Sequence, residues 1–218
     1  MTSPDASRAR RIRMLVISPF PDEAAGTRFR ISQYIPFLEA NGFDVSVDAF
    51  YTRSFFGLVY RKGHYVRKAV TLAGLALRRL TAMIGAGRYD LIFIYRDAFP
   101  IGPPFLERHL AHLGPAIVLD FDDAFYLSNA SENASDANRF LASFKNVQKV
   151  PTIIRLADRV VVGNEYLAGY ARAHNTAVTM IPTCVDTSRF VPRADGNPGD
   201  PPVVGWIGSP TTTPYLTG

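Results

Sequence analysis

Residues 91–120, LIFIYRDAFPIGPPFLERHLAHLGPAIVLD, contain the pattern that decides the fold of this chain. Two short apolar runs, Leu91–Tyr95 and Ala116–Asp120, flank a helical pattern that opens on Pro103 and reaches about Leu113. Proline is tolerated in the first turn of a helix, because the N–H that it lacks would have no partner there. A strand, a helix and a second strand in succession predict a parallel sheet.

The same alternation continues in both directions along the chain. Near-continuous Val, Ile and Leu is typical of strands that are covered on both faces. The sequence therefore predicts an α/β domain built on a doubly wound parallel sheet of the Rossmann-like class. Its further strands are expected at Ile12–Ser18, Asp44–Ala49, Arg159–Val162 and Val178–Ile181.

Helical patterns fill the spaces between these strands. One covers Ile31–Leu38, where Pro36 should kink the helix and Gly42 suits its C-terminal cap. Asparagine is a favoured N-cap residue, so Asn164 should begin a helix that reaches His174. Further helices are expected over Asp136–Lys149 and Pro151–Ala157.

The longest helical pattern lies between residues 66 and 84. Apolar side chains recur there at helical spacing, and we expect their common face to pack on the sheet. The opposite side should carry four cations with Leu72 and Leu75 among them. The apolar set is Val66, Val70, Ala73, Leu77, Leu80 and Ile84, and the cations are Arg67, Lys68, Arg78 and Arg79.

The composition is that of an ordinary globular protein, with 47% apolar and 20% charged residues in 218. Cys184 is the only cysteine, so no internal disulfide forms; we expect a buried thiol and a reducing cytoplasm. No apolar run approaches the roughly 20 residues that span a bilayer. The run Met14–Ile17 is too short for a signal peptide. These features predict a soluble chain.

The net charge of +5 is unevenly distributed. No acidic residue lies between Asp48 and Asp90, whereas basic and aromatic residues are interleaved there. Such a segment suits an anionic membrane, a nucleic acid or an acidic glycan, and the alternative is a solvated basic helix face. We expect reversible binding to anionic membranes and no nucleic-acid partner. The residues assigned to the membrane surface are Arg61, Lys62, Arg67, Lys68, Arg78 and Arg79.

Five segments in order carry a family resemblance. They are MLVISPFPDEAAGTRFR (14–30), LEANGFDVSV (38–47), VLDFDDAFY (118–126), ADRVVVGNEYL (157–167) and VTMIPTCVDTSRF (178–190). Together they resemble the N-terminal half of a two-domain, retaining glycosyltransferase of family 4, which has the GT-B architecture. The chain departs from the family pattern at Phe43 (usually His), at Asn164 (usually Ser), and at Thr183 and Cys184 (usually Asn-Gly).

The resemblance implies a domain organisation. Residues 1–11 form a basic tail, 12–182 the Rossmann-like acceptor-side domain, and 183–202 an interdomain linker. Residues 203–218, which begin VVGWIGSP, resemble the first strand and glycine turn of a C-terminal donor-binding domain. On this interpretation the chain stops early, so it should be inactive alone, and residues 203–218 should pack poorly against the first domain.

The resemblance also implies a reaction. A hexosyltransferase of this family moves a glycosyl unit from a nucleotide sugar to an acceptor hydroxyl, in polysaccharide or glycolipid assembly, without a metal cofactor. The nucleotide sugar is bound mainly by the C-terminal domain, and the acceptor is a glycan or a lipid-linked sugar. The expected location is the cytoplasm or the inner face of the plasma membrane. The alternative function is a non-catalytic module that binds an acidic glycan or a protein partner.

The loop after the first strand is the first candidate site. A glycine there lets backbone N–H groups approach an anion, and nearby cations add to the attraction. With the family resemblance, Gly26, Thr27, Arg28 and Arg30 are predicted to contact the donor phosphate or the acceptor. The alternative is an ordinary strand-to-helix turn with surface arginines.

The acidic turn after Leu119 is the second candidate site. Asp120 and Asp122 match the Asp-x-Asp metal signature of the other large glycosyltransferase fold. The family 4 resemblance instead implies that no metal binds here and that Asp122 faces the acceptor hydroxyl as the catalytic residue. Asp123 and Gly208 are assigned to donor-phosphate or acceptor binding. The alternative is that Asp122 and Asp123 cap the next turn or pair with an arginine of the first loop.

Overall fold

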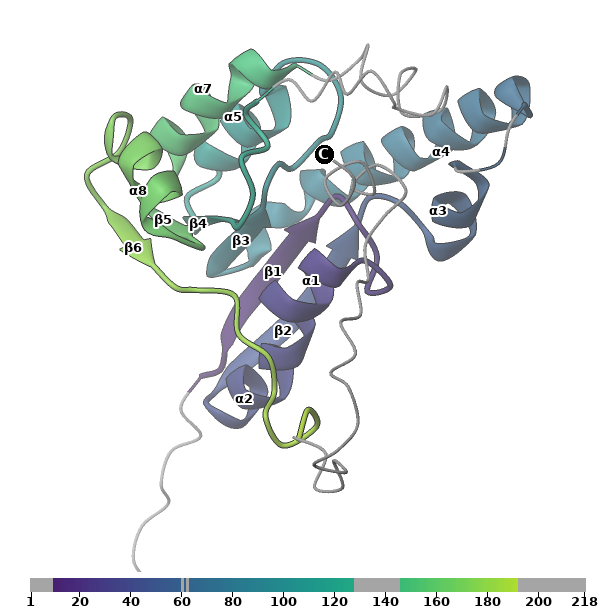
Figure 1. Ribbon diagram of the computed structural model, residues 1–218. Coiled ribbons are helices and arrows are strands. Elements are labelled where there is room, and N and C mark those ends of the chain that lie inside the picture. The colour runs from purple at the N-terminus through teal and green to yellow at the C-terminus, as the bar shows by residue number, and fades with distance from the viewer. Residues whose placement is uncertain (1–9, 60, 62, 128–145, 192–218) are drawn as a thin grey trace, which may run out of the picture.

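The structure is a computed structural model that describes residues 10–59, 61, 63–127 and 146–191. Within these residues six strands form one sheet in which every neighbouring pair is parallel, in the order β2-β1-β3-β4-β5-β6 (Figure 1). The doubly wound α/β class expected from the sequence is confirmed. The strands are β1 (Ile12–Ser18), β2 (Phe43–Ala49), β3 (Leu91–Tyr95), β4 (Ala116–Phe121), β5 (Arg159–Val162) and β6 (Val178–Met180).

The strand order reverses between β1 and β3. The chain adds β2 on one side of β1 and then returns to add β3 and its successors on the other side. In the register, Ser18 pairs with Ala49 and Tyr95 pairs with Asp120, so these strands end at a common edge. Open α/β sheets bind ligands at the carboxyl edge where the order reverses. Any site formed by this fold is therefore expected beyond Ser18 and Tyr95.

Helices cover both faces of the sheet (Figure 1). On one face α1 (Ala25–Arg30), η1 (Ser32–Tyr34) and α2 (Ile35–Ala40) enclose a small core around Met14, Val16, Ile31 and Tyr95. The other face bears the larger core, which includes Ile17, Ile94 and Leu119. The elements on or near that face are α3 (Arg53–Val59), α4 (Tyr65–Ile84), η2 (Ala86–Arg88), α5 (Phe105–Ala111), η3 (Val147–Lys149), α7 (Val150–Leu156) and α8 (Glu165–Arg172).

The strand positions agree with the sequence prediction to within one residue. Asn164 caps α8 as expected, because its side chain accepts a hydrogen bond from the Leu167 N–H at 3.0 Å. The expectation for Pro36 is wrong: the helix breaks at Ile31 and Pro36 lies in the first turn of α2, where proline costs nothing. Most of the helix expected over 136–149 lies outside the described residues, and α3 was not expected.

The orientation of α4 is the reverse of the sequence prediction. The stripe that should pack on the sheet is exposed, with Val66 at 79% and Ile84 at 76% of their full accessibility. The buried residues of α4 are instead Lys68, Leu75, Arg79 and Met83. Of the cations assigned to a membrane surface, Lys68 and Arg79 are therefore unavailable. Arg61, Arg67 and Arg78 are exposed, and Lys62 lies outside the described residues.

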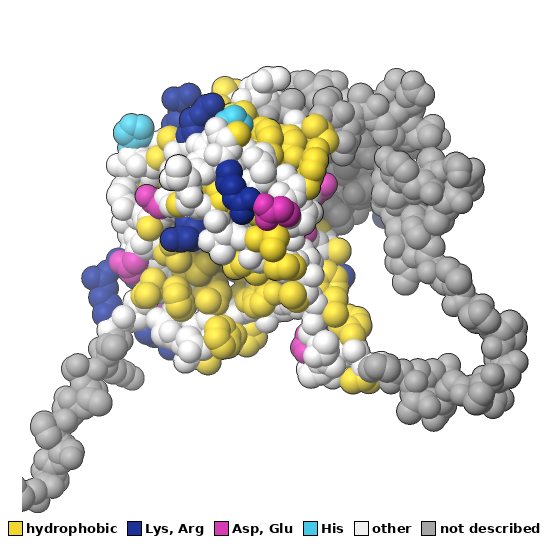
Figure 2. Space-filling model, turned by 60° about the vertical axis from the view of Figure 1, so that its left-hand side comes forward, with side chains coloured by type: hydrophobic (Ala, Val, Ile, Leu, Met, Phe, Trp, Pro, Cys, Tyr) yellow, Lys and Arg dark blue, Asp and Glu magenta, His cyan; other side chains and the backbone are white. Residues whose placement is uncertain are grey.

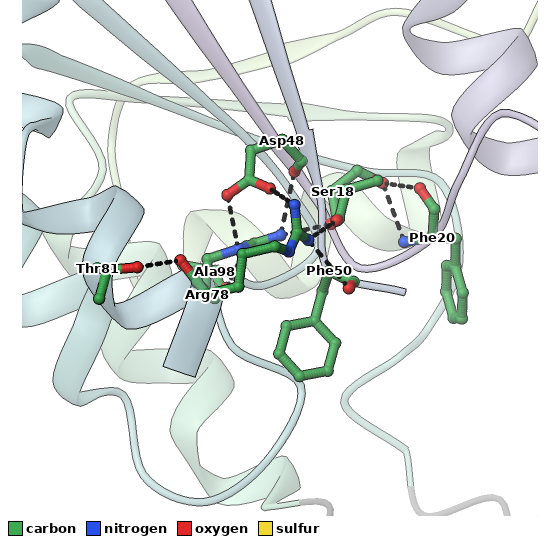
Figure 3. Close-up of polar contacts among 9 residues, drawn as sticks. Ser18, Phe20, Asp48, Phe50, Arg78, Thr81 and Ala98 are labelled. Atoms are coloured by element: carbon green, nitrogen blue, oxygen red, sulfur yellow. Dashed lines mark hydrogen bonds and ion pairs between the residues drawn. The ribbon is translucent and has the colours of Figure 1, made fainter. Parts of the chain in front are cut away.

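Burial of Arg79 is explained by the acceptors around its guanidinium. The Arg79 side chain donates hydrogen bonds to the carbonyl oxygens of Ser18 (3.0 Å), Asp48 (3.0 Å) and Ala98 (2.5 Å). Its Nε also lies 3.0 Å from the Asp48 carboxylate, although without hydrogen-bond alignment. Burial lowers the pKa of Arg79 to about 10, which Asp48 opposes, so the group stays charged at neutral pH. Figure 3 shows how Ser18, Asp48 and Ala98 converge from separate segments.

The segment after β6 returns along the α1 side of the sheet (Figure 1). Arg30 donates to the Ile181 carbonyl at 2.6 Å, and Gln33 donates to the Cys184 carbonyl at 2.9 Å. Figure 2 shows hydrophobic side chains gathered on one side of the molecule. Met180, at the end of β6, is 46% exposed. Cys184 is exposed, which corrects the expectation of a buried thiol. The rest of the expected linker and all of residues 203–218, with Gly208, lie outside the described residues.

None of the helices in the described part of the chain has the length and apolar character needed to cross a membrane.

Candidate functional site

Asp120, Asp122 and Asp123, at the end of β4, have three different environments. Asp120 is the last but one residue of the strand and is 1% exposed. Asp122 is half-buried and Asp123 is exposed, because the chain leaves the sheet after Phe121. All three lie at the carboxyl edge, next to the point where the strand order reverses. Their different partners decide what each can do.

Asp120 forms a buried ion pair with Arg30. The Arg30 Nε donates to Asp120 Oδ2 at 3.0 Å, and a second guanidinium nitrogen contacts Oδ1, so the pair is bidentate. Burial raises the pKa of Asp120 to about 6, while the hydrogen bond from Arg30 acts in the opposite direction. Asp120 is consequently ionised at neutral pH and holds Arg30 inside the protein. The Arg30 guanidinium joins β4 to the Ile181 carbonyl, and its contact with a ligand stays a prediction.

Asp123 is paired with Arg96, the residue immediately after β3. The Arg96 side chain donates to Asp123 Oδ2 at 3.1 Å, and its guanidinium carbon lies 5.7 Å from the centre of the Phe20 ring. Arg96 has φ = 65°, a left-handed conformation that is uncommon for a residue other than glycine. Its buried Nε has no hydrogen-bond partner among the described residues. Arg96 therefore places a cation, with a buried Nε that is unpartnered within the described part of the chain, directly after β3.

A buried ionic cluster stabilises the strained turn at Arg96. The Lys149 ammonium lies 3.2 Å from Asp97 Oδ2 and 3.9 Å from Glu107 Oε1. Glu107 also accepts a hydrogen bond from the Ala98 N–H at 3.0 Å. Burial raises the pKa of Glu107, and the Lys149 charge opposes that shift. Because these groups hold the two residues after Arg96, the surrounding structure can maintain its unfavourable backbone conformation.

Asp122 contacts hydroxyl groups. The Tyr95 hydroxyl donates to Asp122 Oδ1 at 2.8 Å, and the Thr183 hydroxyl lies 3.5 Å from Oδ2. Burial raises the pKa of Tyr95, so this hydroxyl stays protonated and acts as the donor. Among the described residues Asp122 forms no ion pair, whereas Asp120 and Asp123 each have an arginine. Tyr95 thus orients one oxygen of Asp122, and the Thr183 hydroxyl is the more distant partner of the other.

Two glycines allow this close arrangement. A Cβ on Gly26 would lie 2.1 Å from the Tyr95 hydroxyl, and a Cβ on Gly163 would lie 3.1 Å from the Asp122 Cα. The space beside Gly26 is therefore occupied by Tyr95, and the contact of this loop with a phosphate or the acceptor stays a prediction. Thr27 is buried, and its hydroxyl contacts Ser18 Oγ at 3.1 Å and the Phe20 carbonyl at 3.1 Å. Arg28 is exposed and remains a candidate.

Substitution of Gly26 by Ala should displace the Tyr95 hydroxyl and destabilise the fold by about 1–3 kcal/mol, the usual cost of overpacking. Tyr95→Phe alone should cost about 1 kcal/mol, because one hydrogen bond is lost. The double variant should be more stable than the sum predicts, since its nearest remaining contact is a ring carbon at 3.0 Å. Urea unfolding of the four proteins measures this coupling. Strict additivity would show that Gly26 and Tyr95 do not compete for the same space.

No group of three or more His, Cys, Asp or Glu side chains in the described ranges is arranged to hold a metal ion. The Asp-x-Asp pair does not converge on a common point, because Asp120 is turned to Arg30 and Asp122 to Tyr95.

Sequence reasoning missed Tyr95 and Arg96. The available signal was their position, since both stand at the carboxyl end of a predicted buried strand, where ligand-binding residues of open sheets are found. It assigned Asp122 to the acceptor side but did not identify the groups that orient it. Scans against family models and against curated proteins find no match for this chain.

Proposed function

We propose that this domain binds the acceptor of a sugar-nucleotide-dependent, retaining glycosyl transfer at the carboxyl edge of the sheet, beside Tyr95, Arg96 and Asp122. The observation that carries the proposal is the environment of Asp122. It is the one acid of the turn that has no arginine partner among the described residues, and it lies at the carboxyl edge beside the reversal of strand order. The family 4 resemblance supports the same assignment.

In this proposal Asp122 is the proton acceptor. The oxygen of the acceptor hydroxyl forms a new bond to the anomeric carbon of the donor, the bond from that carbon to the nucleotide diphosphate breaks, and the hydroxyl proton passes to Asp122. Tyr95 donates to Oδ1 at 2.8 Å, and the acceptor hydroxyl would take the place of the Thr183 hydroxyl, which lies 3.5 Å from Oδ2. General bases are effective when they are positioned in this way before the substrate arrives.

Arg96 has the second role in the proposal. Its unused buried Nε and its position beside Phe20 suit a phosphate of either the acceptor or the donor. The Asp123 carboxylate, which is exposed, then acts as a replaceable partner that occupies the arginine when no phosphate is bound. The reaction would take place in the cytoplasm, with a nucleotide sugar as co-substrate and a glycan or lipid-linked sugar as acceptor.

Backbone amide NMR of the 218-residue chain tests the acceptor site directly. Methyl hexosides and inorganic pyrophosphate serve as probes. We expect the hexosides to shift the amides of Asp122, Asp123 and Gly163, and pyrophosphate to shift Arg96. Asp122→Asn should weaken the hexoside effect, whereas Glu165→Gln, at the exposed start of α8, should leave it unchanged.

Two outcomes contradict the proposal. Shifts confined to residues away from the carboxyl edge would show that the hexosides do not bind beside Asp122. A response to sulfated or carboxylated glycans without any response to neutral hexosides would favour the alternative, a module that binds an acidic glycan.

A further inference from the structure

The exposed stripe of α4 is an apolar feature of the described surface that the proposed function does not use. Its members are strongly exposed, at 79% for Val66, 68% for Val70, 63% for Leu77 and 76% for Ile84. Leu80 is 37% exposed and Ala73 is also exposed. At 3.6 residues per turn these side chains fall within about 80° of one another, over about 27 Å of helix. Figure 1 shows α4 as a long helix that extends beyond the edge of the sheet.

The stripe cannot turn inward, because the opposite face of α4 is anchored. Leu75 and Met83 are buried in the larger core, at 7% and 1% exposure. Arg79 is fully buried and donates to Ser18, Asp48 and Ala98, which belong to three different segments. Rotation of the helix would separate the charged Arg79 guanidinium from its three carbonyl acceptors and would expose Leu75 and Met83. The outward direction of the stripe is therefore a property of the folded domain.

The charges beside the stripe indicate what covers it. Arg67 and Arg78 lie eleven residues apart, so at 100° per residue both fall on the same flank of the stripe. Both are exposed, Arg78 with 46% of its side chain, and Arg61 is exposed in the turn before the helix. No acidic residue occurs between Asp48 and Asp90. Asp48, which lies outside the helix, pairs with Arg78 at 3.1 Å, whereas α4 itself carries apolar and cationic side chains and no acid.

This charge pattern distinguishes between the candidate occupants. A second copy docked through α4 would bring the same cations together, and α4 carries no acid to compensate them. An anionic bilayer can bind both the apolar stripe and the arginines. The apolar side chains enter the boundary between headgroups and acyl chains, and the arginines contact lipid phosphates.

We propose that α4 lies in the surface plane of an anionic membrane, with Val66, Val70, Leu77 and Ile84 inserted and Arg67 and Arg78 at the headgroups. This differs from the sequence expectation, in which Leu72, Leu75 and four cations faced the lipid. The inference does not depend on the reaction that the domain supports. It would place the carboxyl-edge site at a fixed height relative to the bilayer.

Vesicle partitioning of the 218-residue protein tests the proposal. Vesicles of phosphatidylcholine alone are compared with vesicles that also contain phosphatidylglycerol, across a salt series. We expect at least about tenfold stronger binding to the anionic vesicles at low salt, with a loss as salt rises, because each cation contributes about 1 kcal/mol. Val70→Ser with Leu77→Ser should reduce binding about 10–100-fold. Phe37→Ser, an exposed apolar residue of α2, is the matched control and should have no effect.

A fluorescent label makes the result independent of altered stability. In a Cys184→Ser background, an environment-sensitive dye at Ala73→Cys should shift to the blue with anionic vesicles, whereas the same dye at Phe37→Cys should not. Equal binding to both vesicle types, or none to either, would overturn the proposal. So would a blue shift that depends on protein concentration in the absence of lipid, because it would show that a second copy covers the stripe.

Discussion

Asp122→Asn should lower kcat for glycosyl transfer by about 10²–10⁴-fold in the intact enzyme of the proposed reaction, the size of effect that loss of a general base produces. The substitution keeps the shape of the side chain, and Tyr95 can still donate to the remaining oxygen. What it removes is the capacity to accept the proton of the acceptor hydroxyl. KM for the acceptor should change much less, since the hydrogen-bonding geometry around residue 122 is retained.

Glu165→Gln is the matched control for this experiment, because Glu165 is exposed and its ion pair with Arg172 is also exposed. Loss of an exposed ion pair changes stability by about 0–1 kcal/mol. The control should retain most of kcat. If Asp122→Asn leaves kcat intact and changes only the unfolding midpoint, Asp122 has a structural role and the proposed chemistry is excluded.

Arg79→Ala should destabilise the domain by about 3–5 kcal/mol, the cost of removing one member of a buried charged network. The free energy of unfolding of a domain is about 5–15 kcal/mol, so this single substitution removes a large part of it. The reason is that Arg79 holds the carboxyl ends of β1 and β2 and the loop after β3 through the carbonyls of Ser18, Asp48 and Ala98. Urea unfolding gives the free-energy difference from the shift in midpoint at constant slope.

Arg78→Ala is the control, since the two arginines are neighbours and both contact the Asp48 carboxylate. Arg78 retains 46% side-chain exposure, so its ion pair should be worth about 0–1 kcal/mol. A similar cost for both substitutions would show that burial of Arg79 contributes nothing. It would also weaken the inference about α4, because that inference requires Arg79 to fix the orientation of the helix.

Local pattern was sufficient for the sheet. Strands such as Leu91–Tyr95 carry their apolar residues in one continuous run, so their ends can be predicted from neighbouring residues alone. Local pattern failed for α4, which has two candidate faces. Periodicity selects the apolar one, yet the buried face contains Lys68 and Arg79. The long aliphatic stem of arginine packs like an apolar side chain once its head finds acceptors, and those acceptors come from distant segments.

The sequence by itself determined that this protein has a parallel α/β sheet, because hydrophobic period is a property of adjacent residues. It also determined that acids and a glycine loop stand at strand ends, where such sheets bind ligands. Only the tertiary structure decided which of these acids has no arginine partner among the described residues. Asp120 pairs with an arginine 90 residues away, and Asp122 is oriented by a tyrosine 27 residues away. Such pairings depend on which strands become neighbours, and the order of strands is set by the packing of the whole domain.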